Sequence, residues 1–203
     1  MADHPLTLVL ATANAHKVGE IRSILASGDL AVDLRPRPAE VPEVVEDAGT
    51  LEGNARLKAV ALAEATGRPA LADDTGLEVD ALDGAPGVES AYYGGGDHDS
   101  AANVARLLRE LDGVAAAART ARFRAVVLVR WPDGREVAAE GVLDGVVVDA
   151  PRGDHGFGYD PVFAPAEAAG RTLAELAPDE KDALSHRGRA LRALADRLGA
   201  EAP

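Results

Sequence analysis

Two adjacent carboxylates, Asp73 and Asp74, are the side chains of this chain whose type and spacing point most directly to chemistry. They follow a short apolar run, residues 70–72, and we predict that Thr75 and Gly76 then form a turn before an extended segment. Carboxylates at the carboxyl end of a buried strand lie where open α/β sheets bind ligands. Neighbouring carboxylates repel unless a cation or a proton separates them, and Mg²⁺ is commonly held by one or two carboxylates together with substrate phosphates. The alternative is a solvated turn in an acidic protein.

A second candidate is the stretch TANAHK, residues 12–17. It joins an apolar run, residues 6–11, to apolar residues at helical spacing, which predicts a strand, a turn and a helix. The first N–H groups of a helix have no internal partners and carry partial positive charge, so this turn could hold an anion, with Lys17 adding a full charge. The alternative is an ordinary helix cap at Thr12 or Asn14.

Three other segments could contribute to a site. Residues 36–47 form a proline-rich, acidic connection that contains Glu43 and Glu46. It could contribute to the site or, alternatively, be a solvated charged loop. Phe157 and Tyr159 lie among glycines in a chain with only 3% aromatic residues, so they could stack on a base or, alternatively, form a turn with a core aromatic. A basic segment, residues 181–187, opens the helix expected over residues 178–198 and could converge on a ligand or simply decorate the surface.

The composition excludes several classes of function. A formal net charge of -13 over 203 residues argues against a nucleic-acid duplex as partner. The absence of cysteine removes disulfides, thiol catalysis and thiolate metal sites. No apolar run is long enough for a membrane span, and residues 1–15 lack the basic start of a signal peptide. We therefore expect no membrane partner and a cytoplasmic location.

The elements that must position these side chains form an α/β pattern. Strands over residues 6–11 and 70–72 and the helices near them, including one over residues 51–66, make a β-α-β opening. Strands over residues 122–131 and 135–142 follow, joined by a turn at residues 132–134. A mostly antiparallel second part suggests a second lobe, and clefts between lobes are common small-molecule sites.

Five stretches together resemble the inosine/xanthosine triphosphate pyrophosphatase family. They occur in the family's order over nearly the whole chain: LATANAHK at 10–17, EDAGTLEGNARLKA at 46–59, ALADDTGLEVDALDGAPGVESA at 70–91, GFGYDPVF at 156–163 and EKDALSHRGRAL at 180–191. The resemblance implies a two-lobed α/β fold over residues 1–203, with a long central mixed sheet flanked by helices and the active-site cleft between the lobes. It also implies a homodimer.

The same resemblance implies a reaction. ITP, dITP or XTP and water give the monophosphate and pyrophosphate with Mg²⁺, which removes deaminated purine nucleotides from the pool. A nucleotide-binding module without turnover, and a pyrophosphatase acting on modified pyrimidines, remain alternatives.

Residue by residue, the resemblance implies that Asp74 binds the metal and activates the attacking water, with Asp73 beside it. Glu46 is the first choice for the second metal ligand and Glu43 the alternative. The expected substrate-binding residues are Thr12, Ala13, Asn14, Ala15, His16, Lys17, Thr75, Phe157, Gly158, Tyr159, Asp160, Lys181, His186 and Arg187. Among them, Arg187 or His186 would donate to the oxygen at purine C6, which adenine lacks, because a buried donor left unpaired is costly.

Three positions depart from the family pattern. Ala13 replaces a common glycine of the first turn, and Thr75 replaces serine. Tyr92 stands where the family usually has arginine, so a role of that arginine has no support in this chain.

Overall fold

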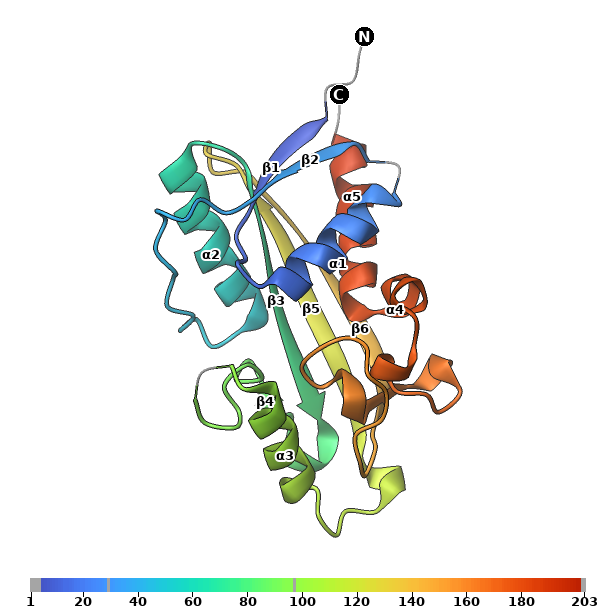
Figure 1. Cartoon of the computed structure of the whole chain (residues 1–203). Helices are drawn as coiled ribbons and strands as arrows, with labels where there is room; N and C mark the ends of the chain where they lie inside the picture. The colour runs from blue at the N-terminus through green and yellow to red at the C-terminus, as the bar shows by residue number, and fades with distance from the viewer. Residues whose placement is uncertain (1–4, 29, 97, 202–203) are drawn as a thin grey trace. The chain divides into compact units, whose positions relative to one another are not determined.

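The computed structural model describes residues 5–28, 30–96 and 98–201 (Figure 1). Five α-helices are described: α1 (Ala15–Ala26), α2 (Leu51–Thr66), α3 (Ser100–Glu110), α4 (Pro178–Leu184) and α5 (His186–Glu201). The strands are β1 (Leu6–Leu10), β2 (Val32–Arg35), β3 (Ala70–Val79), β4 (Pro86–Gly87), β5 (Thr120–Arg130), β6 (Glu136–Val147) and β7 (Phe163–Pro165). No helix among these residues is both long enough and apolar enough to cross a lipid bilayer.

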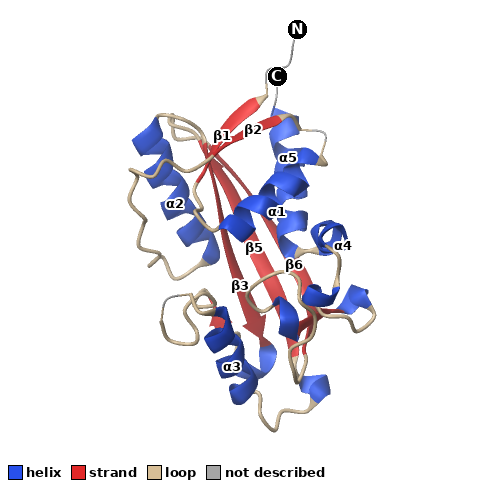
Figure 2. Cartoon of the chain, viewed as in Figure 1, coloured by secondary structure: helices blue, strands red, loops and turns tan. Residues whose placement is uncertain are grey.

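The strands form one open mixed sheet of seven strands (Figure 2). Their order is β2-β1-β3-β5-β6-β7, with β4 paired to β3 beside this path. β1 runs parallel to β2 and to β3, whereas β4 is antiparallel to β3 and β7 is antiparallel to β6. The mixed α/β sheet with helices predicted from the sequence is therefore confirmed.

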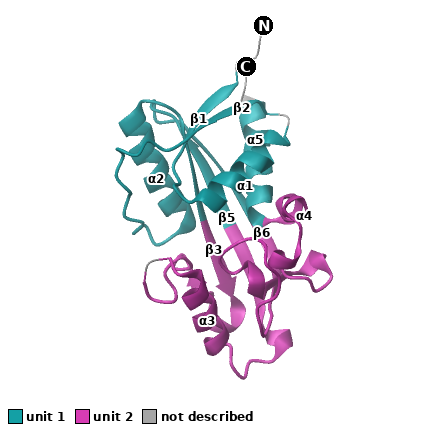
Figure 3. Ribbon diagram, viewed as in Figure 1, with its two compact units in different colours: residues 1–74, 125–141, 186–203 teal, residues 75–124, 142–185 magenta. Residues whose placement is uncertain are grey.

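The chain divides into two compact units (Figure 3). Unit 1 comprises residues 1–74, 125–141 and 186–203, and unit 2 comprises residues 75–124 and 142–185. Unit 1 has an apolar core in which Leu10 and Leu71 pack with Leu191. Unit 2 has a separate core that contains Phe123 and Phe163, whose ring centroids lie 4.8 Å apart. Each unit thus buries its own apolar residues.

The expected turn at Thr75 and Gly76 is wrong, because β3 continues without interruption from Ala70 to Val79. Gly76 is buried, and so are the apolar residues that follow it in the strand. Their burial favours an extended backbone at this point. The neighbouring strand β1 ends first, since its last registered pair joins Leu10 to Leu71. The two carboxylates therefore lie inside β3, just beyond the end of β1.

The single helix expected over residues 178–198 is also wrong. Ser185 is extended (φ -62°, ψ 155°) and separates α4 from α5. The start of α5 packs against β6 so closely that a Cβ at Gly141 would lie 2.1 Å from the His186 carbonyl oxygen. A close approach of this kind between distant segments cannot be read from the helical spacing of residues 178–198.

The helix expected over residues 51–66 is confirmed as α2. Thr50 caps its start by accepting the Gly53 N–H at 3.0 Å, and Gly67 ends it in the left-handed conformation at φ 62°. This helix carries two of the side chains that reach the carboxylate pair.

Candidate active site

Asp73 lies in a buried chain of alternating charges within unit 1. Its Oδ2 accepts from Lys17 Nζ at 3.1 Å and from Arg187 Nη2 and Nε at 3.1 and 3.3 Å. The other side of the Arg187 guanidinium donates to Glu20, so that carboxylates flank this arginine on both sides. The four residues come from α1, β3 and α5, and they tie these elements together.

The ionised form of Asp73 is strongly favoured in this setting. Burial opposes its ionisation, but the charges of Lys17, Arg187 and Lys58 together hold the pKa of its carboxyl far below the usual value. Burial also disfavours the charged Arg187, yet Asp73 and Glu20 raise its pKa on balance. Asp73 therefore acts as a fixed anion between two cations.

Asp74 has a different set of partners. Its Oδ1 accepts from Lys58 Nζ at 2.9 Å and its Oδ2 from Asn54 Nδ2 at 3.2 Å. Asn54 and Lys58 are one turn apart on α2, so both lie on the helix face that meets β3. Lys58 Nζ also donates to Glu46 Oε2 at 2.9 Å. One ammonium group thus joins Asp74 to the acidic loop.

Asn54 also fixes the end of that acidic loop. Its amide oxygen accepts from the Ala48 N–H at 3.1 Å, while its amide nitrogen donates to Asp74. A Cβ at Gly53 would lie 2.5 Å from the Ala48 side chain, so the loop packs directly on the start of α2. These contacts bring Glu46 toward Asp74 through Lys58.

Burial raises the pKa of Asp74 above its usual value, and the nearby charges of Lys58 and Lys17 offset this effect only in part. The pKa of the preceding Asp73 is shifted in the opposite direction. Neighbouring acids whose environments push their pKa values apart are typical of sites that need one permanent anion and one proton acceptor.

The residues around Asp74 fit a hard divalent cation. Among the residues that the structure describes, no group of three or more His, Asp or Glu side chains is arranged to hold a metal ion. Mg²⁺ does not need such a cage, because it takes one or two carboxylates and fills its remaining positions with water and substrate phosphates. Asp74 and Glu46 offer two oxygens around a single cationic nitrogen, and Asp73 Oδ1 is a buried oxygen with no hydrogen-bond partner within the described parts of the chain.

In the turn at residues 12–17, Asn14 is the N-cap of α1, as the capping alternative predicts. Its side-chain oxygen accepts from the His16 and Lys17 N–H groups at 3.0 and 3.2 Å, and its own N–H donates to Thr12 Oγ1 at 3.2 Å. Ala13 is exposed and has no positive φ, so its replacement of glycine causes no backbone strain. Two of the N–H groups expected to bind an anion therefore already donate to Asn14.

Unit 2 contains the aromatic loop, and Asp160 holds it together. Asp160 Oδ2 accepts from the Phe157 N–H at 2.8 Å and from Lys181 Nζ at 2.6 Å. The same ammonium lies 4.9 Å from the centroid of the Phe157 ring. Gly156 permits this arrangement, since a Cβ there would lie 2.1 Å from Asp160 Oδ2. Phe157 is partly exposed, whereas Asp160 and Lys181 are buried.

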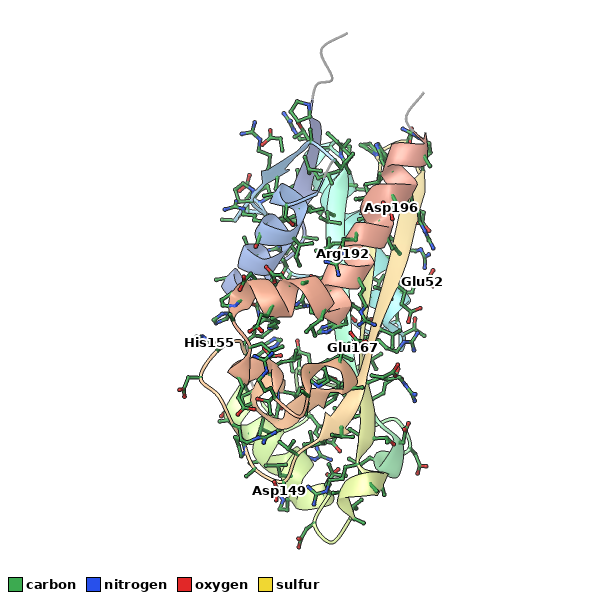
Figure 4. The ribbon with its side chains drawn as sticks, turned by 90° about the vertical axis from the view of Figure 1, so that its right-hand side faces the viewer. Glu52, Asp149, His155, Glu167, Arg192 and Asp196 are labelled. Atoms are coloured by element: carbon green, nitrogen blue, oxygen red, sulfur yellow. The ribbon has the colours of Figure 1, made fainter. Side chains whose placement is uncertain are left out.

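Other residues anchor the loop within unit 2. Tyr159 is buried in the core of this unit, and its hydroxyl donates to the Ser90 carbonyl at 2.9 Å. Gly158 has a φ of 62°, in the region that favours glycine. The N–H of His155, which is labelled in Figure 4, donates to the Ala174 carbonyl at 3.0 Å. Of the two loop aromatics, Phe157 is the one that is partly exposed.

The predicted basic segment is divided between the units. Lys181 belongs to unit 2, and His186 and Arg187 belong to unit 1. His186 and Arg187 are 3% and 2% exposed, so both are buried. Thr75, at the unit 2 end of the carboxylate pair, is partly exposed in β3.

Sequence reasoning missed three residues of this site: Glu20, Asn54 and Lys58. Glu20 follows Lys17 by three positions on α1, and Asn54 precedes Lys58 by four on α2. Each spacing places both side chains on one helix face, which is a signal that was available. Which strand residue each face meets depends on helix packing, and no local pattern specifies that.

Comparison with known proteins places these features in a family. The model of the Ham1 family matches residues 8–197. The chain is 52% identical over 194 residues to a dITP/XTP pyrophosphatase of Nitratidesulfovibrio vulgaris, covering 93% of each chain. It is 48% identical over 190 residues to that of Lactiplantibacillus plantarum, covering 94% of this chain and 93% of the relative.

Solved structures agree. A HAM1 protein from Coxiella burnetii superposes with a TM-score of 0.86 at 38% identity, covering 96% of this chain and 99% of that one. A nucleoside-triphosphatase, dITP/XTP pyrophosphatase, from Mycobacterium abscessus gives 0.75 at 43% identity, covering 93% and 98%. The family resemblance found in the sequence is confirmed, and the chain belongs to the Ham1 family.

Proposed function

We propose that this protein is a Mg²⁺-dependent pyrophosphatase that converts dITP, ITP and XTP to the monophosphate and pyrophosphate, and so removes deaminated purine nucleotides from the pool. The names of the relatives support the reaction and its substrates. The observation that carries it in this chain is the buried Asp73–Asp74 pair, in which Asp73 contacts Lys17 and Arg187 while Lys58 joins Asp74 to Glu46.

Asp74 is the proton acceptor in this mechanism. Asn54 donates to its Oδ2 at 3.2 Å and holds the carboxylate in place, and burial of the side chain favours acceptance of a proton. It takes a proton from the water that attacks the α-phosphorus, and the bond to the pyrophosphate oxygen breaks. Asp74 and Glu46 would hold Mg²⁺, which when bound supplies positive charge against the triphosphate and lowers the pKa of water.

Lys17 has two roles in the proposal. Its ammonium neutralises Asp73, and its side chain is 19% exposed, so Lys17 also meets the solvent from which a triphosphate arrives. Because Asn14 caps α1, the turn at residues 12–17 offers the phosphates the ammonium of Lys17 and the exposed residues Ala13, Ala15 and His16 rather than a bare helix terminus.

Base recognition remains a prediction for Phe157 to Asp160, Lys181, His186 and Arg187. The partial exposure of Phe157 supports stacking of its ring on a purine. Arg187 is engaged by Asp73 and Glu20, so a contact to the C6 oxygen would have to share its guanidinium with these carboxylates.

We expect Arg187→Ala to lower the preference for ITP over ATP, measured as the ratio of kcat/KM values. An unchanged ratio removes Arg187 from base reading.

The test of the proposed function is turnover of dITP with Mg²⁺, read for both products. In ¹⁸O water the label should enter the monophosphate, because water attacks the α-phosphorus. Asp74→Asn should lower kcat by at least about 10²-fold, in line with loss of a general base, while the protein stays folded. A panel of purine and pyrimidine nucleotides distinguishes this activity from that of a modified-pyrimidine pyrophosphatase. If no nucleotide in the panel releases pyrophosphate, the protein is a nucleotide-binding module without turnover.

The proposal includes two further expectations from the sequence, a homodimer and a cytoplasmic location. Both follow from the family resemblance and the composition. Size-exclusion chromatography with light scattering measures the mass of the protein in solution, and a mass equal to one chain, 20.9 kDa, contradicts the homodimer.

A further inference from the structure

The contact that joins Asp74 to Glu46 is a single ammonium group. Lys58 Nζ lies 2.9 Å from Asp74 Oδ1 and 2.9 Å from Glu46 Oε2. These are the two carboxylates to which the proposed function assigns the divalent cation. The oxygens therefore already point at one common positive charge, and that charge belongs to the protein.

The surroundings of this contact differ from those of an ordinary surface ion pair. The Lys58 side chain is 13% exposed and that of Asp74 is 9% exposed, while Glu46 is 34% exposed. The ammonium is thus held on the buried side by Asp74 and on the accessible side by a carboxylate from a loop. A long lysine side chain can withdraw from such a position by rotating its flexible stem.

We propose that Lys58 and the divalent cation compete for the same two carboxylate oxygens, so that the cation binds only as the Lys58 ammonium leaves them. This inference rests on the proposed assignment of Asp74 and Glu46 as metal ligands. A doubly charged ion with short bonds to oxygen, about 2.1 Å for Mg²⁺, has the stronger Coulomb attraction for the pair. The ammonium keeps the two carboxylates from repelling each other until that ion arrives, and it lowers the apparent affinity for the ion.

The test is cation binding without nucleotide, measured by calorimetry with Mg²⁺ and by electron paramagnetic resonance with Mn²⁺. Lys58→Met removes the competing ammonium and should lower the dissociation constant of the cation by about tenfold or more. Lys58→Gln, which keeps a hydrogen-bond donor for the carboxylates, should act in the same direction and guards against a folding defect. Circular dichroism and a thermal melt establish that each variant is folded.

Two matched controls separate competition from general electrostatics. Lys17→Met removes one positive charge from the neighbouring Asp73 but no contact of Asp74 or Glu46, so it should tighten binding much less, by about threefold or less. Arg56→Gln removes a cation from the same helix, one that pairs with Glu52 and Glu136, and should leave the dissociation constant unchanged. An equal effect of Lys58→Met and Lys17→Met would overturn the proposal.

A crystal soaked in Mn²⁺ gives the direct view. The ion should lie between Asp74 and Glu46, with Lys58 Nζ withdrawn from both. An ion bound there while Lys58 still bridges the pair, unchanged affinity in both Lys58 variants, or no binding by any variant, each contradicts the inference. Failure of the enzyme activity is a separate outcome, because turnover of dITP by the unmodified protein is measured independently of these affinities.

Discussion

The Asp73 and Asp74 carboxylates are neighbours in sequence, and their surroundings differ in burial and in the kind of partner. Asp73 contacts cations from α1 and α5, with no side-chain exposure. Asp74 contacts an amide and an ammonium from α2, and that ammonium continues to a partly exposed loop carboxylate. Because successive strand residues point to opposite faces of a sheet, adjacent side chains enter different environments. One strand can therefore supply a structural anion and a reactive carboxylate side by side.

The largest effect on stability is expected from removing the negative charge of the buried Asp73. Asp73→Asn removes the counter-charge that Lys17 and Arg187 share and leaves Arg187 with Glu20, and breaking a buried ion pair costs about 3–5 kcal/mol. Urea unfolding measures this loss. The matched control is Asp33→Asn, which breaks a largely exposed pair with Arg35 and should change the free energy of unfolding by less than about 1 kcal/mol. Equal losses in the two variants would show that Asp73 is not a buried structural anion.

A smaller effect is expected from Glu20, at the far end of the same charge chain. Glu20→Gln keeps an acceptor for the Arg187 guanidinium but removes one of its two counter-charges, so we expect a loss of about 1–3 kcal/mol. Glu52→Gln is the control, because Glu52, labelled in Figure 4, pairs with Arg56 at the surface with a side chain that is 58% exposed. If the two variants are equally stable, the Glu20–Arg187 contact contributes nothing beyond a surface pair.

The pH dependence of stability should differ in sign between the two carboxylates. The pKa of Asp73 is lowered on folding, so its ionisation stabilises the protein above the usual carboxyl pKa of about 3.9, and this contribution is lost as pH falls toward the folded value. The pKa of Asp74 is raised on folding, so its contribution is full below about pH 3.9 and is lost as pH rises through the folded value.

This difference is measured with chelator present, by unfolding the variants from acid to neutral pH. The deficit of Asp73→Asn relative to the unmodified protein should grow as pH rises. Asp74→Asn should instead gain relative to the unmodified protein over the same range. Parallel curves for the two variants would contradict the opposite pKa shifts.

Local rules predicted much of the fold from the sequence. Apolar runs and cap residues gave β1, the sheet class and both ends of α2. The turn expected at Thr75 and Gly76 failed because burial of the residues that follow keeps β3 extended, and the expected C-terminal helix is interrupted at the extended Ser185, next to the close approach of His186 to Gly141. Both errors arise where contacts between distant segments override local preference.

The sequence pointed to the carboxylates of the candidate site more fully than to the residues that contact them. Within unit 1, Lys17 pairs with Asp73 and Lys58 joins Asp74 to Glu46, and the roles that the family pattern implies for Asp74, Glu46 and Lys17 stay predictions. The bridging position of Lys58 and the pairing of Arg187 with Asp73 depend on how α2 and α5 pack on β3, which no spacing in the sequence reports.

One paired measurement tests the central claim most directly: the rate of pyrophosphate release from dITP with Mg²⁺ and the unfolding free energy, determined together for Asp74→Asn and Asp73→Asn. The account predicts that Asp74→Asn is at least as stable as the unmodified protein while its turnover collapses, and that Asp73→Asn loses stability. A stable Asp73→Asn protein together with near-normal turnover by Asp74→Asn would contradict it.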